Sequence, residues 1–222
     1  MTSSADRPDV VVIAEQGTVM RPAFTDDQLV ETGLGKYVAW LADRGQRFHS
    51  YDELWAWSVD DLEGFWASLW EYFEVPGSSG TCVLTDRTMP GVNWFPTART
   101  NYAECVLTAA DDPDRPAVRG HSQTREPIEL SFGELAEQVR RAQSAFKSLG
   151  VSRGDFVVGY LPNVPEAVVA MLATVSLGAV WACCPPEFGA RSVVDRLAQL
   201  NPKLLVAVSG YTYGAKKRRP DV

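Results

Sequence analysis

Residues 159–181, GYLPNVPEAVVAMLATVSLGAVW, decide the fold of this chain. The first three of these residues belong to the apolar run 156–161, FVVGYL. This run predicts a buried strand. Pro165 and the apolar run after it predict a helix that ends at Gly178, because proline suits the first helical turn and glycine the end. We expect Asn163 to cap this helix. Because the helix is apolar almost all round, we expect other elements to cover it on both sides.

Two further strands lie downstream of this stretch. Residues 179–184, AVWACC, and residues 203–209, KLLVAVS, predict strands that are fully buried. Between them, residues 190–200 predict a helix that ends at Asn201-Pro202. The side chains expected to face the core from this helix are Val193, Val194, Leu197 and Leu200.

Upstream of the stretch, Ser131 and Glu134 have the spacing of a capping box. They open a helix that Gly150 ends. Its expected inward positions are Leu135, Val139, Ala142, Phe146 and Leu149. Before it, residues 101–110 predict a short helix, and residues 117–120 and 128–130 predict a hairpin. Alternating strands and helices together predict an α/β fold with a parallel sheet and right-handed crossovers.

The N-terminal third of the chain predicts helices. Residues 1–24 show no sustained period and read as a flexible leader. Thr25 is expected to cap a helix with the stripe Leu34, Val38 and Leu41, and Ser58 to begin a second helix. The apolar face of the second helix is Leu62, Phe65, Trp66, Leu69 and Phe73. Five of the seven tryptophans lie in residues 40–73, which indicates either a ligand pocket or an aromatic core that packs a small cap onto a larger domain.

Composition excludes some classes of function. A net charge of −7 argues against a nucleic-acid partner, and the basic run 216–219 reads as a solvated tail. The four cysteines form no C-x-x-C pair, and with only two histidines no metal-ligand spacing occurs. Adjacent Cys183 and Cys184 read as small buried side chains on opposite faces of a strand. The polar N-terminus and the short apolar run 10–14 predict a cytoplasmic protein without a membrane segment.

Several long segments resemble one known family. Residues 93–104, NWFPTARTNYAE, resemble the signature W-F-P-G-A-x-L-N-Y-A-E-N of acetoacetyl-CoA synthetases. Residues 185–205 resemble S-P-D-F-G-x-x-S-V-x-D-R-x-x-Q-I-x-P-K-V-L, and residues 51–75 and 159–181 match the same family. The resemblance covers about residues 30–216. It implies the N-terminal subdomain of an adenylate-forming enzyme.

This resemblance implies a division of the chain and a reaction. Residues 25–91 would form a helical cap, and residues 92–222 the first part of the AMP-binding domain, so that the fold is incomplete. In the family, ATP and acetoacetate give acetoacetyl-adenylate and pyrophosphate, and CoA then displaces AMP, with magnesium assisting. The phosphate loop, adenylate motif and catalytic lysine of the family lie downstream of the part present here. We therefore expect no catalytic residue in the chain and no activity from it alone.

Other functions stay open at this point. The chain could be a non-catalytic module that binds CoA or a nucleotide or another protein. It could be a piece of a related acetyl- or propionyl-CoA synthetase, or a decayed copy. Because the helix after Pro165 is so apolar, we also expect self-association through exposed apolar surface.

One segment, residues 209–216, SGYTYGAK, has three interpretations. It echoes the phosphate loop T-S-G-T-T-G-x-P-K, although two tyrosines replace small residues. It also resembles D-G-Y-x-Y-G-G-K of the family, which is expected near the nucleotide end of CoA. In that case Tyr213, Gly214 and Lys216 are the candidate CoA-binding residues, with Lys216 as the phosphate partner and Gly214 allowing a close approach. The third interpretation is a plain turn after a strand.

Two acidic residues read as surface groups. Glu166 falls in the first turn of the apolar helix, where a negative charge suits the helix dipole. Arg191 and Asp195 are four residues apart and are expected to pair on a helix face.

Overall fold

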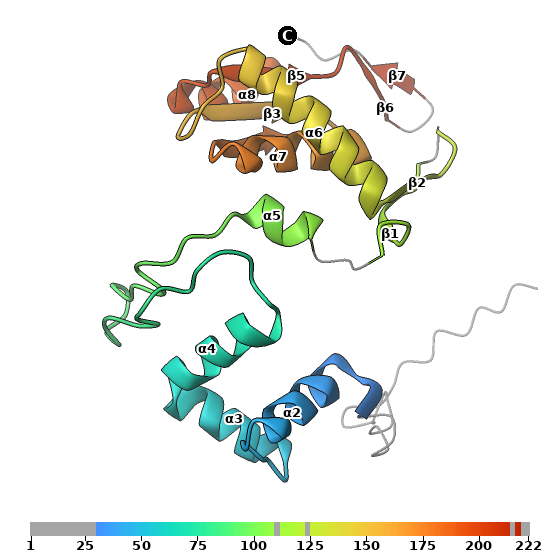
Figure 1. Cartoon of the computed structure of the whole chain (residues 1–222). Coiled ribbons are helices and arrows are strands. Elements are labelled where there is room, and N and C mark those ends of the chain that lie inside the picture. The colour runs from blue at the N-terminus through green and yellow to red at the C-terminus, as the bar shows by residue number, and fades with distance from the viewer. Residues whose placement is uncertain (1–29, 109–111, 123–124, 214–215, 219–222) are drawn as a thin grey trace, which may run out of the picture. The chain divides into compact units, whose positions relative to one another are not determined.

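The structure is a computed structural model that describes residues 30–108, 112–122, 125–213 and 216–218. The chain divides into two compact units, residues 1–68 and 69–222, which are described separately below (Figure 1). The expected leader and the expected cap Thr25 lie outside the described residues.

The first unit is helical, as expected, but its helices begin at other residues. Helices α2 (Gly33–Asp43) and α3 (Tyr51–Asp60) are capped by the side chains of Thr32 and Ser50. The expectation that Ser58 begins a helix is wrong, because Ser58 lies inside α3 and donates to the carbonyl of Trp55.

Helix α4 (Leu62–Tyr72) begins one residue after Asp61 and continues into the second unit. The Asp61 carboxylate accepts a hydrogen bond from Gly64 N at 3.0 Å. An acidic side chain in this position satisfies an N–H group that the first helical turn leaves open. The apolar face expected on α4 was overestimated, since none of its residues is fully buried.

Aromatic side chains pack the first unit internally. The Trp57 ring lies 5.2 Å from Phe48 and 5.6 Å from Phe65, centroid to centroid. Tyr37 and Leu41 are buried on α2, whereas Leu34 of the expected stripe is exposed. These contacts show aromatic packing within this unit, and the expected packing of a cap onto a larger domain stays a prediction.

A three-stranded parallel sheet forms the centre of the second unit, with strand order β4-β3-β5. Strand β3 (Phe156–Tyr160) lies between β4 (Val180–Cys184) and β5 (Leu204–Ala207). The expected parallel α/β arrangement is therefore confirmed. One side of the sheet packs with α6 (Phe132–Ser148) and α7 (Pro165–Ser176), and the other side carries α8 (Ala190–Leu197).

Smaller elements surround this sheet. The expected hairpin is present as β1 (Pro116–Gly120) and β2 (Ile128–Ser131), which pair antiparallel. Helix α5 (Tyr102–Leu107) is capped by Asn101, whose amide also donates to Val175 O of α7 at 2.9 Å. A 3₁₀ turn, η1 (Ala198–Leu200), follows α8.

The C-terminal segment forms a second hairpin. Strand β6 (Tyr211–Tyr213) pairs antiparallel with β7 (Lys216–Arg218). The first three residues of the basic run thus belong to a strand rather than to a tail.

Helix α6 confirms the capping box and most of the expected stripe. Ser131 and Glu134 cap each other's backbone, and Leu135, Val139 and Phe146 are buried. The expectation for Leu149 is wrong, since this side chain is 61% exposed. Leu149 is the C-cap residue, where the backbone leaves the helix and turns at Gly150.

Helix α7 contributes five buried residues to the core, Val169, Ala170, Leu172, Ala173 and Thr174. Leu172, Ala173 and Thr174 are at most 1% exposed, and the Thr174 hydroxyl donates to Ala170 O. It packs against α5, α6, β1 and β4, which confirms the expected cover on both sides. The expected cap is wrong: Val164, not Asn163, is the N-cap residue, and no side chain caps this helix.

The two outer strands are less buried than expected. Val180 and Leu205 are 43% and 50% exposed, and Cys183 is exposed while Cys184 is buried. Val194 of α8, expected to face inward, is 59% exposed. The physical reason is that the described sheet has two open edges and a single helix on one side. An apolar run cannot show which strand will be an edge.

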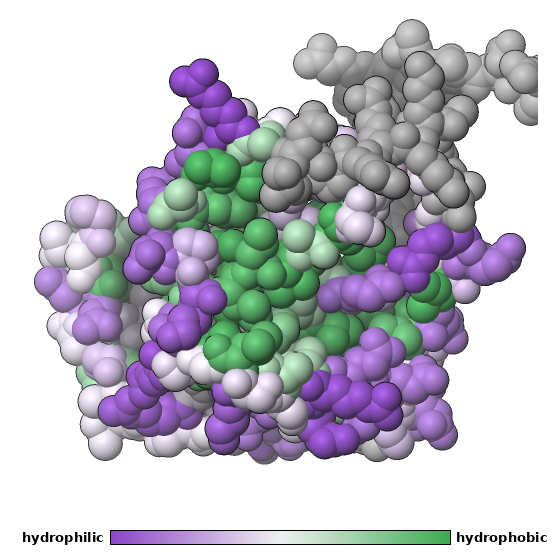
Figure 2. Space-filling model, turned by 90° about the horizontal axis from the view of Figure 1, so that it is seen from above, coloured by the Kyte–Doolittle hydropathy of each residue, from purple (hydrophilic) through white to green (hydrophobic). Residues whose placement is uncertain are grey.

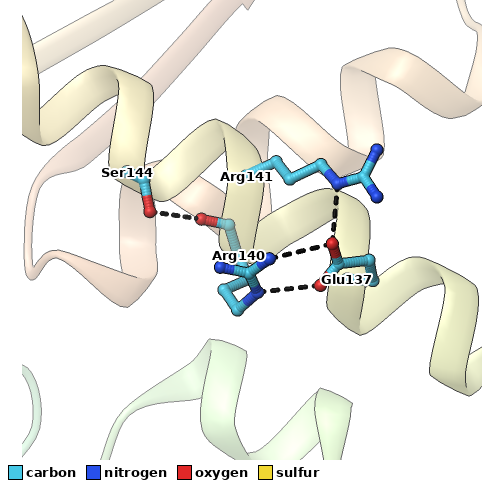
Figure 3. Close-up of polar contacts among 4 residues, drawn as sticks. All are labelled: Glu137, Arg140, Arg141 and Ser144. Atoms are coloured by element: carbon cyan, nitrogen blue, oxygen red, sulfur yellow. Dashed lines mark hydrogen bonds and ion pairs between the residues drawn. The ribbon is translucent and has the colours of Figure 1, made fainter.

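The solvent side of α6 carries a small ion network (Figure 3). Arg140 makes two hydrogen bonds to the Glu137 carboxylate, at 2.8 and 2.9 Å, and Arg141 makes one at 2.6 Å. The hydrogen bonds from Arg140 and Arg141 lower the pKa of Glu137 to about 2. These are exposed ion pairs, so we expect them to contribute little to stability.

The buried helix yields a first testable prediction. Leu172→Ala should lower the free energy of unfolding by about 2–5 kcal/mol, because it leaves a cavity beside α7. Leu149→Ala makes the same chemical change at an exposed site and should cost less than about 0.5 kcal/mol. Urea unfolding measures both, and equal losses would contradict the burial described here.

A second prediction concerns pH. The Glu137 carboxyl resonance in an NMR titration should change at a pH of about 2. Because this pKa is depressed in the folded state, the carboxylate favours the folded state above its ordinary pKa of about 4.3, and the benefit is lost as the pH falls through the lower value. Replacing Arg140 and Arg141 with alanine should return the titration toward the ordinary value. An unchanged titration in that variant would show that the arginines are not the cause.

Candidate functional site

A cleft of about 1030 Å³ opens at the carboxyl ends of β3 and β5 in the second unit. Three parts of the chain line it: residues 118–122 and 125–128 of the hairpin region, residues 161–168 where β3 leads into α7, and residues 208–212 after β5. In open α/β sheets, ligands bind outside the carboxyl ends of the strands. The position of this cleft therefore makes it the candidate site of the described chain.

Close backbone packing brings the hairpin to this place. A Cβ atom on Gly120 would lie 2.9 Å from Cγ of Pro165, so any side chain there would push the hairpin away from the start of α7. Pro165 in turn fixes the first helical turn. Glycine at one residue and proline at the other let β1 end directly against α7.

The loop after β4 lies across the neighbouring crevice, between β3 and β4. These strands lead to helices on opposite sides of the sheet, which is where α/β folds often bind ligands. Here the buried Tyr160 hydroxyl donates toward the carbonyl oxygens of Phe188, at 2.6 Å, and Pro186, at 3.1 Å. The loop after β4 is thereby held over the end of β3, and the open cleft lies on the β5 side.

The cleft has an apolar lining and a polar rim. Its apolar residues are half-buried, and its charged and amide residues are exposed. The apolar group is Val118, Ile128, Leu161, Val164, Val168 and Val208, and the polar group includes Arg119, His121, Arg125, Glu126, Asn163, Glu166 and Thr212. Such a lining suits a ligand with a flat or aliphatic body and a polar end.

An ion pair joins two sides of the rim. Arg125 donates to both carboxylate oxygens of Glu166, at 2.8 and 3.4 Å. The hydrogen bond from Arg125 lowers the pKa of Glu166, and the same bond raises the pKa of Arg125. Glu166 was expected as a surface acid favoured by the helix dipole, and it lies in the first turn of α7 as expected. Its contact with Arg125, 41 residues away, was not visible in the sequence.

Arg119 on the rim is paired as well. Arg119 and Glu129 face each other across the hairpin, with Nε and Oε2 at 2.7 Å. At the start of α7, Pro165 has no N–H group, and the Glu166 carboxylate accepts from its own backbone N–H. Both arginines of the rim are therefore paired with a glutamate.

Two of the three residues expected to bind CoA belong to the C-terminal hairpin, whose strand β6 borders the cleft. Tyr213 ends β6 and Lys216 begins β7, and their Cα atoms are paired in the hairpin. Gly214 lies outside the described residues. Tyr211 and Thr212, from the same β6 strand, line the cleft directly.

Sequence reasoning identified one border of the cleft and missed the others. It singled out residues 209–216, but not the hairpin loop or Asn163 as site residues. A signal was present, because Pro162 and Asn163 come directly after a buried strand, where parallel sheets place their ligands.

The described residues form neither a metal-binding cluster nor a membrane span. No group of three or more histidine, cysteine or acidic side chains lies close enough there to hold a metal ion. No helix in that part of the chain combines the length and apolar character needed to cross a membrane.

Comparison with known families and proteins gives consistent matches. The family model for AMP-binding enzymes matches residues 106–221, which is more than half of the chain. The model for the acetyl-coenzyme A synthetase N-terminus matches residues 51–106.

Individual relatives agree with these models. The chain is 37% identical over 205 residues to acetoacetyl-coenzyme A synthetase of Rhizobium meliloti (strain 1021), covering 90% of this chain and 31% of the relative. It is 39% identical over 178 residues to acetoacetyl-CoA synthetase of Rattus norvegicus, covering 78% of this chain and 26% of that protein.

A solved structure extends the likeness to the fold. Acetoacetyl-CoA synthetase from Streptomyces lividans superimposes with a TM-score of 0.80 at 43% identity, over 88% of this chain and 31% of that one. The chain thus spans about a third of the length of these relatives. The chain belongs to the AMP-binding enzyme family, and within it both sequence and fold are similar to the N-terminal part of acetoacetyl-CoA synthetases.

Proposed function

We propose that this chain is the N-terminal part of an ATP-dependent acetoacetate–CoA ligase. The reaction would convert acetoacetate, ATP and CoA to acetoacetyl-CoA, AMP and pyrophosphate, in the cytoplasm. The observation that carries this proposal is the combined 43% identity and TM-score of 0.80 to the Streptomyces lividans enzyme. Small molecules are accordingly the proposed partners, and no nucleic acid or membrane.

Within this proposal, the chain supplies a scaffold rather than the reacting groups. We assign residues 25–91 to the helical cap and residues 92–222 to the first part of the AMP-binding domain. Adenylate formation requires donors around the ATP phosphates, because charge develops on them in the transition state. The sequence holds no T-S-G-T-T-G-type loop that would supply such donors.

Magnesium would accompany ATP in this reaction, but the described residues do not fit a metal site. They contain no cluster of three potential ligands. We therefore assign no metal ligand to this chain and derive no step through the ion.

A second candidate function is binding without catalysis. It is favoured by the cleft, which the described residues form by themselves at the carboxyl end of the sheet. Under this candidate, residues 209–216 bind the nucleotide end of CoA, with Tyr213, Gly214 and Lys216 as the contacts. An exposed lysine–phosphate contact is weak and is screened by salt.

The first candidate predicts an inactive chain. The purified 222-residue protein should show no acetoacetate-dependent exchange of pyrophosphate into ATP above a blank without enzyme. Each preorganised donor that is lost lowers the rate by roughly 10²–10³-fold, and the sequence lacks the whole phosphate loop. The Streptomyces lividans enzyme in the same assay is the positive control. Clear pyrophosphate exchange by this chain would contradict the proposal, because it would show that the reacting groups lie within these 222 residues.

The second candidate predicts salt-sensitive CoA binding. Lys216→Ala should weaken CoA affinity several-fold at low salt, measured by calorimetric titration, and leave ATP affinity unchanged. Lys147→Ala, which removes the same charge from the last turn of α6, is the matched control and should change neither. If the two variants bind CoA equally well, the segment is a plain turn between strands.

A further inference from the structure

The structure divides the basic run near the C-terminus between two faces of a strand. The first three residues of this run, Lys216, Lys217 and Arg218, form β7. Successive positions of a strand point to opposite faces of the sheet. Positions 216 and 218 therefore share one face of β7, and position 217 lies on the other. A run that reads as one block of charge in the sequence becomes a pair of positions and a single position.

Pairing with β6 shows what accompanies each group. The Cα partners are Tyr211 with Arg218, Thr212 with Lys217, and Tyr213 with Lys216. Directly opposite positions of an antiparallel pair lie on the same face of the sheet. One face of the hairpin thus alternates two tyrosine positions with two cationic positions, and we call it the tyrosine face, made of positions 211, 213, 216 and 218.

The tyrosine face is the one turned toward the cleft. Tyr211 is half-buried and lines the cleft, whereas Thr212, on the other face, is exposed and belongs to the rim. The half-buried side of the hairpin faces the body of the second unit, where the cleft lies. Figure 2 shows hydrophilic residues at the border of an apolar area, also on the right, the side on which β6 and β7 lie in Figure 1.

The other cations at the cleft are already engaged. Arg119 is paired with Glu129 at 2.7 Å, and Arg125 with Glu166 at 2.8 Å. No lysine occurs among the lining residues that the structure describes. An anionic ligand would have to compete with a carboxylate for either arginine. The tyrosine face is therefore the better source of positive charge for an anion at this cleft.

We propose that Lys216 and Arg218 together bind a phosphate monoester of a nucleotide, and that Arg218 is a specificity-determining residue of this site. A phosphate monoester carries a charge of about −1.5 to −2 at pH 7, so that two cations balance it and one does not. Two positions along a strand are about 6.6 Å apart, a spacing from which two long side chains can reach one phosphate group. A guanidinium can also donate two parallel hydrogen bonds to phosphate oxygens.

This inference rests on the second candidate function, binding of CoA by residues 209–216. It adds Arg218 to that site, leaves Lys217 out of it, and names the recognised group. CoA carries one phosphate monoester, the 3′-phosphate of its ribose. Its other two phosphates form a diphosphate bridge with a single charge on each, which one cation can balance.

Calorimetric titration of the 222-residue chain with CoA and with 3′-dephospho-CoA tests the assignment. At an ionic strength of about 0.01 M the native chain should bind CoA at least about fivefold more tightly, and this preference should shrink at about 0.15 M. Arg218→Ala should weaken CoA binding several-fold and leave dephospho-CoA binding unchanged, so that the preference is lost. Arg218→Lys keeps the charge without the two parallel donors and should retain part of the preference.

Lys217→Ala is the matched control. It removes the same charge from the neighbouring position on the other face of β7 and should keep the preference for CoA. Circular dichroism checks that the three variants fold like the native chain.

The possible outcomes separate this inference from the function on which it rests. Binding of CoA without preference over dephospho-CoA, or equal losses from Arg218→Ala and Lys217→Ala, would overturn the inference and leave the CoA-binding candidate standing. A native chain that binds no CoA would overturn both. ATP is the third ligand to titrate, because its terminal phosphate is also doubly charged. If Arg218→Ala weakens ATP binding and not CoA binding, the assignment to the 3′-phosphate is wrong.

Discussion

The packing of α7 between the parallel sheet and α6 is the contact on which the rest of the second unit depends. Leu172, Ala173 and Thr174 lie at the centre of the larger apolar cluster, with almost no exposed surface. Burial of apolar side chains is the dominant favourable term in folding, and this helix has no polar stripe that would let it face water. The strand before α7, the strand after it, and helices α5 and α6 all pack against it. It thereby holds together elements that are far apart in the sequence.

The same helix positions the candidate site. Its first residue, Pro165, receives the backbone of Gly120, so that the hairpin ends against the start of α7. Glu166, one residue later, reaches Arg125 in the hairpin loop. The cleft lies between these contacts and the chain leaving β5. Stability and site are therefore linked here: a change that shifts the start of α7 also changes the shape of the cleft.

The two sides of the sheet are unequal. Two helices cover one side and bury Val157, whereas α8 alone covers the other and leaves Leu205 open on the edge strand. In a sheet of three described strands, both outer strands are edge strands. Each of them has a strand neighbour on one side only. This asymmetry explains the exposed apolar surface without any irregularity in the strands.

The sequence by itself determined the order of the strands and helices of the second unit, the capping box of α6, the burial of α7 and the family. These follow from local signals, such as the Ser131–Glu134 spacing and the apolar period, which act over a few residues. The sequence could not show that Val180 and Leu205 lie on edges, that Leu149 faces solvent, or that Arg125 meets Glu166. Those facts depend on which elements lie side by side. Only the tertiary structure decides this. The residues of an apolar strand are of the same types whether the strand has one neighbour in the sheet or two, so the strand's own sequence does not show its position.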